Sequence, residues 1–166
     1  MVQKSVGSSY PAAVGCLLVL GLAACQQSPL PEMPLDQVRW NSYSDPRLGV
    51  RFQYPDTLEA VDEGEAGMFL RYRGGTNVRL VWTDLQTARE HGLWVGHEPV
   101  AQASLGGRPA SKYLYQHWDG PSFVMTESYV VPYRGKYLAL EFRPGGLPEQ
   151  GRSRLLESFR FLEGNS

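Results

Sequence analysis

The stretch that decides the fold is "SFVMTESYVVPYRGKYLALEFR", residues 122–143. Two strand-like runs, 122–131 and 136–143, are separated only by a break at Tyr133-Arg134-Gly135. Glycine and its polar neighbours interrupt regular structure and favour a turn. Because runs this close together leave no room for a crossover connection, we expect them to be antiparallel neighbours. The stretch therefore predicts a β-hairpin and an antiparallel sheet around it.

Further strand-like runs precede this hairpin and are bounded by turn-forming residues: 49–55, 68–74, 78–83, 100–105 and 111–118. In the first run, Val50, Phe52 and Tyr54 alternate with polar residues before Pro55 stops the ladder, so one face is apolar and the other polar. The second and third runs flank residues 74–77, whose glycine can supply a positive φ, and they predict a second hairpin.

Two segments are typical of helices. Residues 83–92 form a short one, with Thr83 or Asp84 as N-cap and Gly92 as C-cap. The second segment has Pro148 in its first turn and ends in "SFRFLEG". Along it, residues at a four-position spacing indicate one helix face: Leu147, Gly151, Leu155 and Phe159. Strands followed by a closing helix indicate an α+β domain, in which an antiparallel β-sheet is covered by helices.

The N-terminal segment has the pattern of a bacterial lipoprotein signal peptide, which we assign to residues 1–24. Lys4 precedes thirteen uncharged residues, 12–24, a run too short for the roughly 20 apolar residues of a membrane span. Leu22-Ala23-Ala24-Cys25 follows the pattern of a lipobox, in which the thiol of the cysteine receives a diacylglyceryl group. We therefore expect Cys25 to be the lipidated first residue of the mature chain. The alternative is an ordinary secretory peptide with an incidental cysteine.

The rest of the chain divides into a tether, a domain and a tail. Residues 25–39 hold the lipid anchor and a proline-rich tether, 40–163 the globular domain and 164–166 a tail. Cys16 would leave with the signal peptide, so no disulfide is expected. Gln26 stands where an aspartate would favour retention at the inner membrane. We expect the outer membrane with the domain in the periplasm, or the outer face of the cell membrane in a Gram-positive source.

The charge balance argues against nucleic acid as a partner. Sixteen basic and 17 acidic residues give a net charge of -1, with no run of like charge that would attract a phosphate backbone. The expected partner is the membrane, reached through lipidated Cys25, together with an envelope protein complex. We expect a monomer without a cofactor.

Three short motifs stand at the ends of the predicted elements: Tyr54-Pro55, Gly107-Arg108-Pro109-Ala110 and Ser158-Phe159-Arg160-Phe161. Their order over residues 40–163 resembles the PsbP-like domains of bacterial and cyanobacterial lipoproteins and of the extrinsic photosystem protein of plants. The resemblance implies an α/β/α sandwich, with an antiparallel sheet between helices. Many members carry a tryptophan soon after Tyr-Pro, where this chain has Leu58.

No familiar enzyme signature occurs after residue 25: the sequence has no G-x-S-x-G, H-E-x-x-H, C-x-x-C, P-loop or G-x-G-x-x-G pattern there. His91, His97 and Glu98 form one alternative, because imidazoles with a carboxylate can bind zinc or copper. His117 with Asp119 and a serine forms another, a hydrolase whose residues converge only in space. The other interpretation treats these residues as polar side chains of exposed loops.

Aromatic residues are the remaining candidates for a binding face: Trp82, Trp94, Trp118, Tyr113, Tyr115, Tyr129, Tyr133 and Tyr137. Tyr113 and Tyr115 would share one strand face. Such a face either binds a partner or packs the sheet against its helices. Together these patterns predict a lipid-anchored, non-catalytic envelope module for binding or assembly. An envelope hydrolase or metal-binding protein using His91, His97 and His117 is the alternative.

Overall fold

The computed structural model describes residues 37–72, 75–119, 122–143 and 146–162; the side chains of Trp118, Asp119 and Ser122 are not described. The expected signal peptide, lipidated Cys25 and most of the tether lie outside these ranges.

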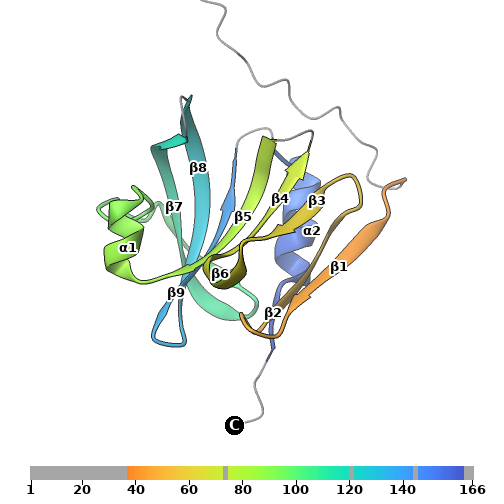
Figure 1. Cartoon of the computed structure of the whole chain (residues 1–166), viewed down its shortest axis with the longest axis horizontal. Helices are drawn as coiled ribbons and strands as arrows, with labels where there is room; N and C mark the ends of the chain where they lie inside the picture. Colours follow the sequence, from red (N-terminus) through yellow and green to blue (C-terminus); the bar gives the residue numbers. More distant parts are fainter. Residues whose placement is uncertain (1–36, 73–74, 120–121, 144–145, 163–166) are drawn as a thin grey trace, which may run out of the picture.

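A seven-stranded antiparallel sheet forms the centre of the domain (Figure 1). Its spatial order is β3 (Glu59–Asp62), β4 (Gly67–Tyr72), β5 (Gly75–Thr83), β9 (Lys136–Phe142), β8 (Ser122–Tyr133), β7 (Arg108–Asp119) and β6 (Ala101–Leu105). The hairpin predicted at 122–143 is confirmed as β8–β9, and the second as β4–β5. Arg134 and Gly135 both have positive φ, 51° and 74°, as a two-residue type I′ hairpin turn requires.

A second, three-stranded sheet has the order β1 (Trp40–Asp45), β2 (Val50–Pro55), β10 (Arg160–Phe161). The prediction that the closing helix runs through "SFRFLEG" is wrong at its end. The helix α2 (Glu149–Ser158) stops at Ser158, Phe159 is extended, and the next two residues pair with β2. The Phe159 ring is completely buried and stacks on Phe52 of β2.

One helix covers each face of the large sheet. α1 (Leu85–Glu90) is confirmed with Asp84 as its N-cap, whose side chain accepts a 2.8 Å hydrogen bond from the Thr87 N–H. Its C-cap is His91 rather than Gly92, which follows with φ 63°. A 3-10 turn, η1 (Gly64–Ala66), precedes β4. In the described part of the chain, neither helix is long and apolar enough to cross a membrane.

Strict alternation along the strands builds two separate cores. In β9, Leu138, Leu140 and Phe142 face α2 and β2, whereas Ala139 faces α1. The first core contains eighteen buried residues and the second seven, so most of the buried apolar surface lies on the α2 side. Burying such side chains stabilises the fold in proportion to the apolar area removed from water. The predicted α+β class, with an antiparallel sheet between helices, is confirmed.

Buried Asp45 organises the turn between β1 and β2. It accepts hydrogen bonds from the backbone N–H groups of Arg47, at 2.8 Å, and Leu48, at 3.2 Å, and from the Arg47 guanidinium. Burial alone would raise the pKa of Asp45. The hydrogen bonds from Arg47 and Leu48 outweigh burial and lower it.

Gly67 provides a test of the β4–β5 packing. With φ 137° and ψ −141°, it has a backbone conformation that only glycine adopts readily, and a Cβ there would overlap the carbonyl oxygen of Leu80. We expect Gly67→Ala to lower the free energy of unfolding by more than about 3 kcal/mol, beyond most point mutations. Gly64→Ala is the matched control, because Gly64 has φ +69° but nothing within 4 Å, and should cost only about 1–2 kcal/mol. Equal losses in chemical denaturation would contradict this account.

Candidate functional site

The structure does not assemble the metal site considered as an alternative. Among the described residues, no three His, Cys, Asp or Glu side chains come together in a way that could hold a metal ion. His91 lies beside a hollow that Asp84 and Lys136 also line, and His97 lies beside a different one with Trp94 and Tyr113. The His91, His97 and Glu98 set is therefore separated.

His97 and His117 instead both lie against one tyrosine, Tyr115. Their ring centroids are 5.3 Å and 5.6 Å from that of Tyr115. The His117 Nδ1 atom is 3.4 Å from the Thr126 hydroxyl. The Asp119 side chain, the other half of the predicted His117 pair, lies outside the described residues.

A buried polar pair lies next to these histidines. The Tyr115 hydroxyl donates a 2.7 Å hydrogen bond to Glu141 Oε1, and the two residues are only 2% and 4% exposed. Ser128 lies opposite Glu141 in the β8–β9 register, and its buried Oγ has no hydrogen-bond partner among the described residues. Burial raises the pKa of Glu141, against the opposing effects of the Tyr115 hydrogen bond and of Arg79 and Arg143. This pair was not predicted from the sequence. The one sequence feature that points to it is an acidic residue inside the apolar run "KYLALEF".

Most of the candidate aromatic residues pack the two cores. Tyr115, Tyr133 and Trp94 are buried, and the others with described side chains are partly buried against a core: Trp82, Tyr113, Tyr129 and Tyr137. Tyr113 and Tyr115 share the α1 face, as predicted, and both belong to the smaller core. These contacts favour the packing interpretation. The Trp118 side chain lies outside the described set.

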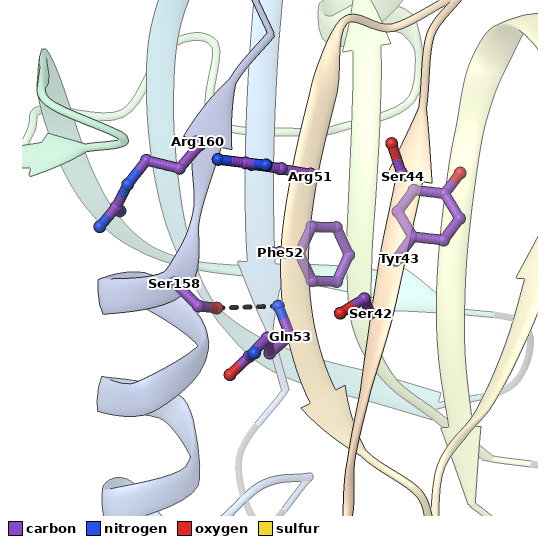
Figure 2. A pocket seen from close by; sticks show the side chains of 8 residues that line it. All are labelled: Ser42, Tyr43, Ser44, Arg51, Phe52, Gln53, Ser158 and Arg160. Atoms are coloured by element: carbon purple, nitrogen blue, oxygen red, sulfur yellow. Dashed lines mark hydrogen bonds between the residues drawn. The ribbon is translucent and has the colours of Figure 1, made fainter.

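An open groove on the three-stranded sheet is the best candidate for a binding site (Figure 2). It has a volume of about 510 Å³ and is lined by three consecutive residues of β1, three of β2 and two near the end of α2: Ser42, Tyr43, Ser44, Arg51, Phe52, Gln53, Ser158 and Arg160. None of these residues was selected from the sequence as a site residue. The last two lie more than 100 positions after the other six, so no local pattern marks the groove.

Strand register sets which side chains face the groove's solvent side. In β2, Val50 and Phe52 are buried in the core, which leaves Arg51 exposed on the opposite face. Ser44 of β1 and Arg160 of β10 lie on either side of Arg51 in the ladder. Sheet pairing therefore places a hydroxyl and two guanidinium-bearing side chains in one row.

The end of α2 forms the second wall of the groove. The Ser158 hydroxyl donates to the Leu155 carbonyl and accepts from the Gln53 N–H, both at 2.8 Å, so it joins the helix end to β2. Arg160 Nη1 donates to the carbonyls of Glu157 and Phe159, both at 2.6 Å. Figure 2 shows the Arg160 guanidinium turned away from that of Arg51. Arg160 therefore caps the helix end, and Arg51 is the charge that the groove offers to a ligand.

The groove offers hydrogen-bond donors and one positive charge. Among the described residues, no carboxylate forms an ion pair with Arg51, and no histidine or acidic residue lines the groove. Burial, with the nearby Asp45 carboxylate, raises the pKa of Tyr43 to about 12; its hydroxyl donates a 3.3 Å hydrogen bond to Asp45 Oδ2, and its ring packs against Phe52 of the core. This chemistry suits recognition of polar or anionic groups and provides no general base.

Comparisons with known proteins agree with an α+β domain on an antiparallel sheet. No known protein family matches the sequence, and no curated protein is similar to it. A solved structure from Bacteroides thetaiotaomicron VPI-5482 is similar at a TM-score of 0.50 and 8% identity over 75% of this chain and 49% of that one. This chain therefore spans about half the length of that protein. At a sequence identity this low, the similarity is evidence about the fold alone.

The solution structure of a cyanobacterial PsbP (CyanoP) from Synechocystis sp. PCC 6803 is also similar. The TM-score is 0.44 and the identity 14%, over 74% of this chain and 92% of that chain. Membership of that family stays a prediction.

The buried Glu141 predicts a pH dependence of stability. Because its pKa is raised in the folded protein, its favourable contribution is complete below the unfolded pKa near 4.5 and is lost as pH rises through the folded value. Glu141→Gln keeps an acceptor for Tyr115 and removes the titration. We expect the free energy of unfolding of the wild type, relative to the variant, to fall between about pH 4.5 and neutral pH in denaturant titrations. Parallel profiles over that range would contradict the buried, titrating carboxyl group.

Proposed function

We propose that this chain is a lipid-anchored, non-catalytic binding or assembly module of the cell envelope, held at the membrane through acylated Cys25. The observation that carries the proposal is the open, polar groove beside β1, the strand that directly follows the tether. Its lining offers donors and a positive charge for recognition. A partner held there would be bound close to the point where the domain joins its anchor.

The free edge of β1 gives a partner a second means of attachment. Among the described strands β1 pairs only with β2, so the backbone groups on its other side point to no strand. Ser42 and Ser44 on this strand are exposed. An extended segment of a partner can add to such an edge through backbone hydrogen bonds, while pockets for side chains supply specificity. Arg51 would supply that specificity for an acidic side chain.

We also place the chain with the PsbP-like lipoproteins. The three motifs of the resemblance lie at junctions of the fold: Tyr54-Pro55 ends β2, Arg108 opens β7, and Ser158 to Phe161 connects α2 to β10. Motifs placed at turns and element ends support a shared plan of the fold. The lipobox before Cys25 and the proline-rich segment after it support an anchored domain on the periplasmic side of the outer membrane.

Anchoring through Cys25 has a direct test. We expect the native chain to fractionate with membranes and to carry an acylated Cys25 as its first residue in mass spectrometry. Cys25→Ser removes the thiol that receives the lipid and should move the exported protein to the soluble fraction. A free Cys25 thiol, or a Cys25→Ser protein that stays on the membrane, would overturn this part of the proposal.

Recognition at the groove is tested by site-specific photocrosslinking in intact cells. A photoreactive residue at Ser44 should give a discrete adduct with an envelope partner, and Arg51→Ala should reduce its yield at least several-fold. Glu90, exposed on α1 on the other side of the sheet, is the matched control position. Equal adduct yields from both positions would argue against the groove. So would an adduct yield at Ser44 that Arg51→Ala does not change.

A further inference from the structure

The β7–β8 ribbon projects from the sheet. The β8–β9 ladder begins at Glu127 opposite Phe142, so residues 122–126 of β8 pair only with β7. On the other side, β6 pairs with β7 only as far as Lys112. Figure 1 shows this ribbon rising beyond the strands next to it. Among the described strands, its far end therefore has no third strand beside it.

Apolar side chains are exposed on one face of this ribbon. Leu114 and Phe123 are 50% and 55% exposed, and Met125 lies between them in the register, opposite Gln116. These three residues face the α2 side, because Tyr115, next to Leu114, is buried on the α1 side. In the described part of the chain only four large apolar residues are at least 45% exposed, and two of them are here. Apolar groups gathered on a projecting element mark an interaction surface.

The chain enters the domain on the same side. Trp40, the first residue of β1, packs under Arg154 of α2, whose Cζ is 4.2 Å from the ring centroid. Arg152, one half-turn earlier in α2, lies 3.5 Å from Glu127, which faces Leu114 across the β7–β8 ladder. Eleven residues, 26–36, separate Cys25 from the first described residue, and a fully extended chain of that length spans at most about 40 Å. A bilayer that holds Cys25 is therefore at most about 40 Å from residue 37, which precedes β1.

The charges around the apolar face suit an anionic lipid surface. Lys112 and Arg152 border it, and among the described residues Glu127 is the carboxylate paired with them, at 3.0 Å from Lys112 and 3.5 Å from Arg152. Two cations against one anion leave an excess of positive charge. Exposed Leu and Phe side chains flanked by Arg and Lys are the combination that binds the interface of an acidic bilayer.

We propose that the end of the β7–β8 ribbon, through Leu114, Phe123 and Met125, docks on the acidic lipid bilayer to which Cys25 attaches the chain. This inference rests on the proposed lipid anchor. Two points of attachment, the acyl chains and the ribbon, fix the orientation of the domain. The α1 side then faces away from the lipid.

The test measures the depth of a spin label on the acylated, full-length protein in vesicles of phosphatidylethanolamine and phosphatidylglycerol. Cys16 is removed and Cys25 blocked by lipid in this protein, so Phe123→Cys introduces the only free thiol. We expect the label at position 123 to collide readily with oxygen and poorly with a water-soluble nickel complex. Leu85→Cys, on the opposite face at 45% exposure, is the matched control and should show the reverse. Leu114→Cys gives a second reading that leaves Phe123 in place.

The outcomes separate this inference from the anchor itself. Acylated protein that sediments with the vesicles, while labels at 114 and 123 stay as accessible to nickel as the label at 85, overturns the docking and leaves the anchor intact. Dipolar broadening between labels at 123 without vesicles overturns it in favour of a second copy of the chain. Protein with an unmodified Cys25 that does not sediment overturns both.

Discussion

Alternation along β9 is the constraint on which the rest of the structure depends. This strand lies inside the seven-stranded sheet, and every second side chain must fill a large core on the α2 side or a smaller one on the α1 side. Leu138 and Leu140 fill the large core on the α2 side. On the α1 side, the small side chain of Ala139 leaves room for α1 and Trp94. A shift of one residue in register would exchange the two faces. The short turn at Arg134 and Gly135 fixes that register.

The three-stranded sheet depends on a second set of contacts, centred on Phe159. Its ring stacks on Phe52 with centroids 5.7 Å apart and meets Phe161 edge-on at 5.5 Å. The β8–β9 turn joins the same region, because the Tyr133 hydroxyl donates to the Gly49 carbonyl and Arg134 to that of Arg47. The groove is the outer surface of this small sheet, so its shape follows from aromatic packing beneath it.

Secondary-structure elements that arise from short, local sequence patterns could be predicted from the sequence. Glycine-containing turns predict both hairpins, and Asp84 predicts the start of α1. The strands that were missed have no local signal: β1 is half exposed and mostly polar, β3 has four residues and β10 two. The Glu141–Tyr115 pair and the groove arise from register between distant strands, which composition does not specify. Cys25, by contrast, is a local sequence pattern that lies outside the described residues.

The position of β10 has a consequence for how the domain is made. Its partner β2 lies more than 100 residues earlier, so the middle strand of the small sheet stays without one neighbour until the last part of the domain has left the ribosome or the export channel. Pairings between such distant segments carry a large loop-closure cost and form late. The groove should therefore be the last surface to form during folding. A partner that binds the groove would then bind only fully folded chains.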